Sequence, residues 1–518
     1  MIKMAFVLIG NNLRFIGGRR VIAVAKKSVC VDVYFVPTNN TMTISAYLNQ
    51  NKAGVFSSID ANIVSETLAY YDIVCFSCMT PTISYVFEIV RNLKERNKKV
   101  FTLVGGVHTT LYPRDAIDRF DAICVGEGEK PIRQFLEAYK NERDYYDTKG
   151  LWFNKNGNVI TNLSATLNSN EELNEYQIGY DGFDYQIYDA KHKQFRQITK
   201  YDYVEFNGLT YYTTWSLGCP FSCSYCANNA FVQIDKDYSK LRFPKPEIIV
   251  REIEEAQKFH PYISTVVFCD DNTIALPFDV LEEFCKLYKS KINLPFFILG
   301  MHPNTIKKEK VELLASYGMN RTRMGIQSGS EKILKMYDRN TSLEKIERGV
   351  VILADAQKKF NMIPPYYDII CDNPAETKDD IISSLKFYNG FKRPFIFQVF
   401  PLYVTPGTKL LSYFKENKIA FSELEFTLAR PTLNNVIVYL IGLIKIPDRM
   451  FEKLISKVKG YNERQKEYPI LLKILHFLAL FKRLIFLLKV RTLPTTSVKW
   501  CYPFWKIFIR KKTKMPGC

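Results

Sequence analysis

The chain has 518 residues, of which 47% are hydrophobic and 24% are charged. This length exceeds a single ordinary hydrophobic core and predicts two or three domains, and the composition excludes a wholly disordered or fibrous protein. The 12 cysteines are too dilute for a disulfide scaffold, and the first residues show no signal-peptide pattern, so we expect a protein of a reducing, cytoplasmic compartment.

The net charge of +18 belongs mainly to the carboxyl-terminal part of the chain. Residues 445–518 contain 18 Lys and Arg against 4 Asp and Glu, and no acidic residue follows Tyr468. Apolar runs are interleaved with these cations, and this composition favours an anionic membrane surface over a nucleic-acid groove. We therefore expect no nucleic-acid partner.

Residues 1–145 alternate short apolar runs with helix-length segments, a pattern that predicts an α/β, doubly wound (Rossmann-like) domain with a parallel sheet. The five predicted strands lie at 4–9, 31–36, 71–77, 100–106 and 121–129. Ligands bind in such folds where the strands end, and the loops after the last three strands are rich in glycine and hydroxyl groups. The candidate binding residues are Ser77, Thr80, Gly105, Gly106, His108, Thr109, Gly126, Glu127 and Gly128. The alternative is three ordinary turns without a ligand.

Residues 146–207 read as a hairpin followed by a linker. Two short apolar runs flank Asn156 and Gly157, which is a strong local signal for a β-hairpin over 151–162. The polar, turn-rich segment 163–207 is predicted to cross to a second domain.

Residues 208–411 repeat a strand followed by a helix, which predicts an open or partial (β/α)6 barrel. Such barrels carry their chemistry on the loops that follow the strands. The six predicted strands lie at 211–217, 265–269, 295–300, 321–327, 366–371 and 395–403.

The loop after the first of these strands contains three cysteines in a Cys-x3-Cys-x2-Cys arrangement, Cys219, Cys223 and Cys226. A four-iron cluster held by three thiolates leaves one iron open for a ligand, whereas a structural zinc site needs four protein ligands. We predict a metal site here, with a zinc site completed by Cys269 or His260 as the alternative.

The cysteine spacing, the aromatic Tyr225 before the third cysteine and the preceding strand resemble the radical S-adenosylmethionine (SAM) superfamily. The resemblance implies a four-iron cluster whose open iron is chelated by SAM. It also implies reductive cleavage of SAM to methionine and a 5'-deoxyadenosyl radical, with an electron donor such as flavodoxin or ferredoxin.

Three later segments resemble strand-end motifs of the same superfamily: FCDDNT at 268–273, MGIQSGSEKILKMYDRN at 324–340 and IICDNPAET at 369–377. The resemblance implies SAM contacts near Tyr225 from Asp271, Gln327, Ser328 and Asp372. Gln327 stands where many relatives have Glu, so it offers a hydrogen bond without a charge. Each of these residues also has an alternative role as a helix cap or turn residue.

The amino-terminal domain resembles the cobalamin-binding domain that precedes the barrel in one large radical SAM class. The segments SCMT (77–80), GGVHTTLYP (105–113) and VGEGE (125–129) would then surround the corrin and its nucleotide tail. The first strand lacks the Asp-x-His-x-x-Gly motif that supplies an imidazole to cobalt. We therefore expect cobalamin bound without a protein imidazole, with His108 shaping its own turn.

Residues 412–518 are predicted to form a basic, apolar helical region. The apolar run 470–490 is interrupted by Lys473, Lys482, Arg483 and Lys489, so a membrane-spanning helix is not expected. The alternatives are a helical domain packed on the barrel and a helix at a membrane interface at the inner face of the cell membrane. The interface is favoured by the cations and aromatic residues of the last segment, which are Trp500, Trp505, Phe508, Arg510, Lys511, Lys512 and Lys514.

The leading functional hypothesis is a cobalamin-dependent radical SAM enzyme that methylates an unactivated carbon of a hydrophobic substrate, with a lipid as one option. A second hypothesis is a radical SAM cyclase or rearranging enzyme without methyl transfer. A third, from another class, is a non-catalytic metal-binding protein with a membrane-docking tail, which would hold zinc and not cleave SAM.

Overall fold

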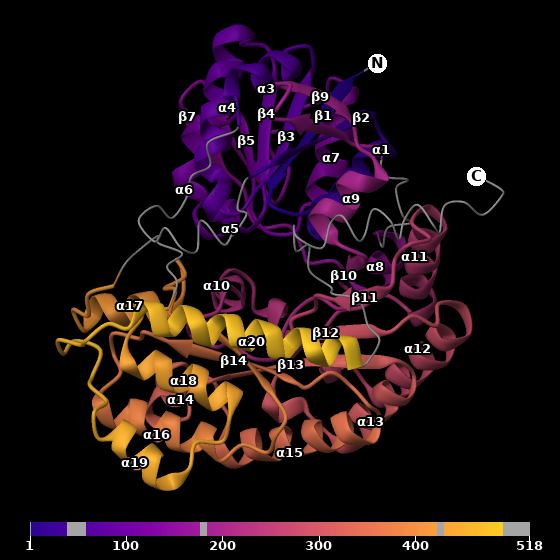
Figure 1. The fold of residues 1–518 in the computed structure, drawn as a ribbon. Helices are drawn as coiled ribbons and strands as arrows, with labels where there is room; N and C mark the ends of the chain where they lie inside the picture. The colour runs from indigo at the N-terminus through magenta and orange to yellow at the C-terminus, as the bar shows by residue number, and fades with distance from the viewer. Residues whose placement is uncertain (1, 39–58, 177–183, 422–428, 490–518) are drawn as a thin grey trace.

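Two β-sheets, one with a parallel centre and antiparallel edges and one wholly parallel, form the framework of the chain in a computed structural model (Figure 1). The structure describes residues 2–38, 59–176, 184–421 and 429–489. In Figure 1 the amino-terminal domain, in indigo and purple, lies above the second domain, in magenta to yellow.

The first sheet has the order β7-β6-β5-β4-β3-β1-β2-β8-β9, and β1 to β5 at its centre are parallel. These central strands confirm the five predicted ones: β1 (Lys3–Gly10), β2 (Cys30–Pro37), β3 (Ile73–Ser77), β4 (Phe101–Gly105) and β5 (Ala122–Cys124). Every residue of β1 after Lys3 is buried, which explains why the strand reads as a continuous apolar run. The helices of this domain are α1 (Ile16–Lys26), α3 (Ala61–Leu68), α4 (Ile83–Arg96), α5 (Val107–Leu111), α6 (Pro113–Ala116) and α7 (Glu129–Lys140).

Two antiparallel hairpins extend this sheet at its edges. The predicted hairpin is present as β6 (Leu151–Lys155) and β7 (Asn158–Thr161), which continue the sheet beyond β5. The predicted linker differs from expectation, because β8 (Gln186–Asp189) pairs with β2 and with β9 (Gln194–Gln197). These strands have four residues each, too short to give a periodic signal. Helices α8 (Asn170–Tyr176) and α9 (Lys200–Asn207) flank them in the chain.

The second sheet contains six parallel strands in chain order, as expected for a partial (β/α)6 barrel. The strands are β10 (Thr210–Thr213), β11 (Thr265–Phe268), β12 (Phe296–Met301), β13 (Met319–Gln327), β14 (Tyr366–Cys371) and β15 (Ile396–Pro401). Helices pack against one face of this sheet through a shared apolar core. The helices of the domain are α10 (Ala227–Ile234), α11 (Pro246–Phe259), α12 (Phe278–Lys291), α13 (Lys308–Ser316), α14 (Glu331–Met336), α15 (Leu343–Lys359) and α16 (Lys378–Asn389).

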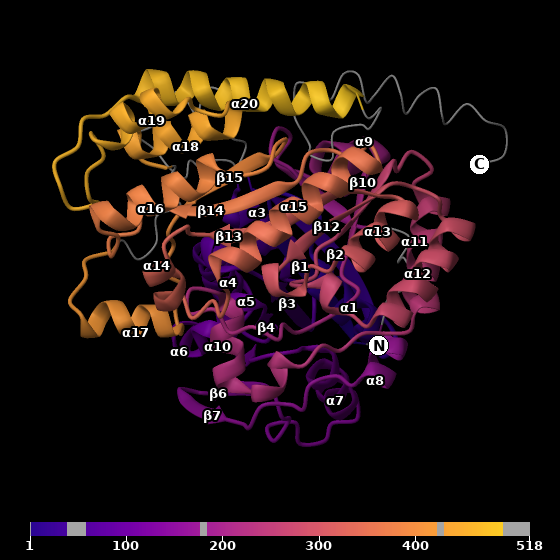
Figure 2. The same ribbon diagram turned by 90° about the horizontal axis from the view of Figure 1, so that it is seen from below.

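The carboxyl-terminal region is helical, as predicted, and packs on the barrel. It consists of α17 (Lys409–Glu416), α18 (Leu433–Leu443), α19 (Asp448–Ile455) and α20 (Pro469–Lys489). Helix α18 lies against α16 and β15, and α20 lies against α18 on the outside of the domain (Figure 2). None of the described helices is long and apolar enough to cross a membrane. The cations and aromatic residues predicted to favour an interface at 500–514 lie outside the described residues.

Hydrogen bonds donated by arginines and one ion pair join the two domains. Arg14 donates to the Tyr212 hydroxyl (2.7 Å), and the guanidinium groups of Arg19 and Arg20, from α1, donate to backbone carbonyls of the segment around β10. On the other side of the interface, Arg242 forms a bidentate pair with Glu127, at 2.8 and 3.1 Å. Both partners of this pair are nearly buried, so neither charge can be satisfied by water if the other is lost.

We predict that Arg242→Met lowers the free energy of unfolding by about 3 kcal/mol, because it leaves the Glu127 carboxylate unpaired at the domain interface. Thermal denaturation measures this loss. The control Lys286→Met breaks the exposed pair with Glu282 and should change stability by less than about 0.5 kcal/mol. An unchanged melting temperature for Arg242→Met would show that the pair does not stabilise the interface.

Candidate active site

The cysteine loop begins directly after β10 and is anchored by backbone contacts. Leu217 forms an antiparallel bridge with Arg242, and the Cys219 amide donates to the Tyr238 carbonyl (3.2 Å). Gly218 has a φ of +89°, and a Cβ there would collide with the carbonyl oxygens of Lys240 and Tyr238. Only glycine therefore allows the loop to turn at this point.

Two buried polar side chains fix the rest of the loop. The Asn229 amide donates to the carbonyl and the hydroxyl of Ser222, while its oxygen accepts from the Lys409 amide (2.9 Å). Ser224 donates its hydroxyl to the Met336 carbonyl (2.9 Å). The loop is thus tied to the start of α17 and the end of α14 before any ligand binds.

The three thiols lie close enough to influence one another electrostatically. Burial, above all, raises the pKa of Cys219 and Cys226 to about 12, and the nearby Asp271 carboxylate adds to the shift. Metal loading must therefore displace protons from these sulfurs at neutral pH.

The thiols are not arranged around a single ion. Among the residues that the structure describes, no group of three or more His, Cys, Asp or Glu side chains is positioned to hold one metal ion. Thiolates of a cluster bind separate irons and need not converge on one point, whereas zinc ligands must. His260, which the zinc alternative named, has its Nδ1 hydrogen-bonded to the Tyr262 hydroxyl (2.7 Å).

Arg339 is a buried cation beside the second cysteine that the sequence did not reveal. One guanidinium nitrogen lies 3.6 Å from Cys223 Sγ and 2.7 Å from the Tyr225 hydroxyl, and the other donates to the Gly325 carbonyl. Electrostatic contact with Tyr225 and the thiols keeps the pKa of Arg339 raised in spite of burial. This charge can offset the negative charge of thiolates bound to iron.

Gln327 lies beside the same arginine at the end of β13. Its φ is +75°, and a Cβ at Gly325 would lie 2.6 Å from the Gln327 amide nitrogen and 2.9 Å from an Arg339 nitrogen. The absence of a side chain at Gly325 therefore lets both groups reach the region of the cysteine loop. Tyr225, Asp271 and Gln327 are thus the SAM-contact candidates that the structure gathers near the thiols.

Asp270, which the sequence analysis did not single out, supports the site. Its carboxylate accepts the amides of Trp215 and Ser216 at 2.8 and 2.7 Å and the Ser216 hydroxyl at 2.6 Å. Burial raises its pKa to about 6 in spite of these bonds. The neighbouring Asp271 is left to face the thiols.

His302, which follows β12, is a further residue of the site that the sequence analysis did not indicate. Its ring stacks on Phe221 of the cysteine loop, with centroids 3.6 Å apart and planes inclined by 15°. Burial lowers the pKa of His302 to about 2, so the ring is neutral at physiological pH. A neutral imidazole can pack against Phe221 without bringing a second cation to the site.

Two other predicted SAM contacts have structural roles. The Ser328 hydroxyl lies 3.2 Å from the Ser384 hydroxyl and accepts the Ser330 amide. The Asp372 carboxylate accepts from the Arg430 amide (2.7 Å) and from the Asn435 side chain (3.0 Å). These contacts fit the alternative roles of turn and docking residues, and the SAM contacts of both residues stay predictions.

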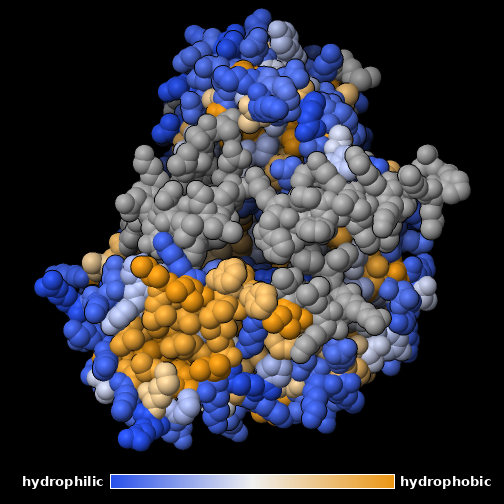
Figure 3. All heavy atoms as spheres, viewed as in Figure 1, coloured by the Kyte–Doolittle hydropathy of each residue, from blue (hydrophilic) through white to orange (hydrophobic). Residues whose placement is uncertain are grey.

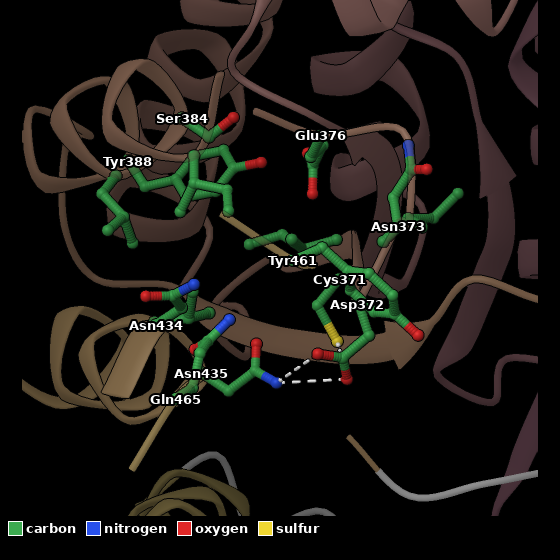
Figure 4. A pocket seen from close by; sticks show the side chains of 15 residues that line it. Cys371, Asp372, Asn373, Glu376, Ser384, Tyr388, Asn434, Asn435, Tyr461 and Gln465 are labelled. Atoms are coloured by element: carbon green, nitrogen blue, oxygen red, sulfur yellow. Dashed lines mark hydrogen bonds between the residues drawn. The ribbon is translucent and has the colours of Figure 1, made fainter. Parts of the chain in front are cut away.

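A polar pocket lies beside Asp372, between the end of β14 and helices α16 and α18 (Figure 4). Asn373, Tyr388 and Asn434 line it together with Glu376. Burial raises the pKa of Glu376 to about 8, and the nearby acidic residues add to the shift. Glu376 is thus predominantly protonated at neutral pH, a feature with no counterpart in the sequence pattern.

The loops at the carboxyl edge of the first sheet use several predicted ligand residues for their own structure. The His108 Nε2 lies 3.0 Å from an Asp115 oxygen, and its Nδ1 lies 3.3 Å from the Thr80 hydroxyl. The buried Thr109 hydroxyl donates to the Cys124 carbonyl (2.7 Å). His108 therefore has both ring nitrogens engaged within this edge.

Close contacts or a positive φ angle explain why glycine occupies several positions of the same edge. Gly106 has a φ of +114° and lies against the Cys78 backbone, and Gly126 has a φ of +97° and faces the Tyr238 hydroxyl of the second domain. A Cβ at Gly105 would lie 3.3 Å from the Cys124 side chain, and one at Gly128 would lie 3.0 Å from Val21. Ser77, at the end of β3, pairs with Gly105 in the strand register.

The carboxyl edges of the two sheets face each other. Helix α5, which follows β4, contacts α10, which follows Cys226, and the Glu127–Arg242 pair closes the same side (Figure 1). Two apolar side chains of the first edge stay exposed there, Met79 at 53% and Val107 at 39%. This edge fits a large ligand with apolar faces, and the cysteine loop opposite fits a cluster held by three thiolates beside a cation.

The sequence of residues 213–388 matches the radical SAM superfamily, and residues 20–136 match the B12 binding domain. The chain carries both domains, and the cofactors that they imply are a four-iron cluster, SAM and cobalamin. A relative from Pyrococcus horikoshii, named an uncharacterized methyltransferase, is 23% identical over 67% of this chain and 70% of its own length.

A second relative is the anaerobic magnesium-protoporphyrin IX monomethyl ester cyclase of Rubrivivax gelatinosus, 25% identical over 55% of this chain. The alignment covers 49% of that cyclase, about half its length. Among solved structures, the radical SAM methyltransferase TsrM of Kitasatospora setae, with tryptophan and a SAM analogue bound, superposes with a TM-score of 0.60. The superposition covers 81% of this chain and 77% of the TsrM chain, and the sequence identity is 13%. This similarity shows a shared fold.

We predict that Arg339→Met makes the reduction potential of the reconstituted cluster more negative, by on the order of 100 mV, because a positive charge beside Cys223 favours the reduced state. A redox titration followed by electron paramagnetic resonance measures the shift. Arg339→Lys keeps the charge and is the control. Equal potentials for Arg339→Met and wild type would show that this charge does not act on the cluster.

Proposed function

Because this chain is a radical SAM enzyme with an amino-terminal B12-binding domain, we propose that it methylates an unactivated carbon of a hydrophobic substrate with the help of cobalamin. The observation that carries the proposal is the opposition of the two carboxyl edges. Helix α5, which begins at Val107, contacts α10, which follows Cys226, so the loops of the two edges lie close to each other.

Each set of residues has a defined task in this proposal. Cys219, Cys223 and Cys226 hold the cluster, and Arg339 balances its charge from the Cys223 side. Asp271 and Gln327 border the space beside the thiols, where SAM would bind. When bound, the cluster and SAM supply a 5'-deoxyadenosyl radical, and cobalamin supplies the methyl group. The chain itself would orient these groups relative to one another.

A cyclase without methyl transfer is the second candidate, and the likeness to the anaerobic magnesium-protoporphyrin IX monomethyl ester cyclase favours it. Both candidates use the same cluster and a hydrophobic substrate. The mass of the product separates them, because methylation adds one carbon and two hydrogens to the substrate, and ring closure adds no carbon. The third hypothesis, a non-catalytic protein, does not hold for a radical SAM enzyme.

The deciding experiment is anaerobic purification and reconstitution with iron, sulfide and cobalamin. The enzyme is then incubated with SAM, a reductant and hydrophobic extracts, and the products are analysed by mass spectrometry. A gain of one methylene unit, with the label of methyl-labelled SAM, supports the proposal. Cleavage of SAM with a product that carries no label supports the cyclase instead.

We predict that Cys223→Ala abolishes both the iron–sulfur absorbance and the formation of 5'-deoxyadenosine, because one iron of the cluster loses its ligand. Cys219→Ala and Cys226→Ala should behave in the same way. Cys285→Ala is the matched control, since Cys285 is a core residue of α12 that packs in the apolar cluster of the barrel. A Cys223→Ala protein that still cleaves SAM would refute the assignment of this ligand.

We predict that Val107→Trp lowers the affinity for cobalamin by about tenfold, or about 1.4 kcal/mol, because it fills space at the exposed carboxyl edge. Iron content should stay the same, since the cysteine loop belongs to the other domain. Tyr70→Trp is the control, because Tyr70 is exposed and lies just before the start of β3, at the opposite edge of the sheet. If wild-type protein retains no cobalt after reconstitution, methyl transfer through cobalamin is excluded.

A further inference from the structure

Helix α20 presents an apolar stripe to solvent. Six large apolar side chains recur at intervals of one to four residues along its outward face, and their exposed fractions range from 39% to 74%. They are Ile470, Ile474, Phe477, Leu478, Phe481 and Ile485. The stripe appears as a continuous orange area in Figure 3, over the helix drawn in yellow in Figure 1. Contiguous apolar surface of this kind marks an interaction site in a folded protein.

Two cations in the carboxyl-terminal half of this helix, Lys482 and Arg483, lie against the protein. The Lys482 ammonium donates to the carbonyl oxygens of Gly442 (2.8 Å) and Leu443 (3.2 Å), which lie in the last turn of α18. The Arg483 guanidinium lies 5.2 Å from the centre of the Tyr366 ring. Surface helices usually turn their apolar face inward and their charges outward, and α20 reverses this arrangement over its carboxyl-terminal half.

A short inward contact holds the helix in place. Leu472 and Leu475 are buried with Val436 of α18 in a small apolar cluster. Residues 472, 475, 482 and 483 therefore fix the rotation of α20 about its own axis. The outward stripe is a consequence of this packing.

The position of α20 links the stripe to the barrel. Successive strand residues point to opposite faces of a sheet, and Tyr367 donates to the Val350 carbonyl of α15 on the helix-covered face. Tyr366 therefore points to the opposite face, where it packs with Tyr212, Val267 and Phe297. Because Arg483 lies over Tyr366, α20 reaches the face of the second sheet that α11 to α16 leave uncovered.

The charge of the adjoining sequence identifies the occupant. From residue 468 to the end, the chain contains 11 Lys and Arg and no Asp or Glu. An apolar stripe followed in the sequence only by cations complements a surface that is apolar below a layer of negative charge, which is the structure of an anionic bilayer. A second copy of this chain would bring the same positive charge to the contact and be repelled.

We propose that the outward stripe of α20 docks the enzyme on an anionic lipid bilayer, with the helix axis in the plane of the membrane. The inference deepens the proposed function and rests on it in one respect: a hydrophobic substrate dissolved in lipid would then lie on the side of the barrel that α20 covers. Interfacial helices bind by burying such a stripe to the depth of the headgroups, without spanning the bilayer.

The test uses the full-length reconstituted enzyme and sedimentation with vesicles. The vesicles contain phosphatidylcholine alone or phosphatidylcholine with phosphatidylserine, at low and high salt. The triple variant Ile474→Ser, Phe477→Ser, Phe481→Ser removes three exposed side chains without touching the inward contacts. We expect at least a tenfold lower partition coefficient for this variant on anionic vesicles. The wild type should bind anionic vesicles more tightly than neutral ones and lose this difference at high salt.

The matched control replaces three exposed apolar residues elsewhere, Tyr70→Ser, Leu163→Ser and Phe278→Ser, and should bind vesicles like the wild type. Iron content and 5'-deoxyadenosine formation are measured on every sample. Loss of vesicle binding with intact SAM cleavage assigns the defect to docking, whereas absent SAM cleavage in the wild type concerns the proposed function alone. Equal partition of the triple variant and the wild type, or a dimer that the triple variant abolishes without vesicles, would overturn the docking proposal.

Discussion

The opposition of two carboxyl edges is the constraint on which the rest of this molecule depends. A parallel sheet offers ligand-binding loops at one edge only, because all its strands end there. Two such sheets can share a ligand only if those edges face each other. Here the bidentate Arg242–Glu127 pair and the arginines of α1 hold the domains in this orientation. Their burial makes the orientation costly to change, since separation would leave several charges without partners at once.

Local signals in the sequence were sufficient to predict the framework. Strands buried on both faces read as continuous apolar runs, and the cysteine spacing lies within eight residues, so neither needs knowledge of the fold. The pair of Arg339 and Cys223 is different, because 116 residues separate its members and nothing near either one indicates the other. The hairpin of β8 and β9 was missed for a related reason: its short strands are specified by their pairing with β2.

A polar residue at the carboxyl edge of a sheet does not by itself indicate a ligand contact. Thr109 and Ser328 offered hydroxyl groups to a ligand in the sequence, yet the fold uses both internally. Asp372 shows what such a residue can do instead: it connects the end of β14 to α18 through Asn435, as Figure 4 shows. Side chains at strand ends are the polar groups nearest to the next layer of structure, so they are also the ones that dock it. The carboxyl-terminal helices are therefore an integral part of the barrel.

The electrostatic environment of the thiols follows from the same crowding of strand ends. Arg339 approaches Cys223 from the loop after α14, while Asp271 approaches Cys219 and Cys226 from the end of β11. The two groups act on the thiols with opposite charges, and Arg339 is buried whereas Asp271 is exposed, so the field of the cation is less screened by water. The net effect favours added negative charge near Cys223. Reduction should then be easiest to support on that side, whereas the Asp271 carboxylate attracts positive charge on its own side.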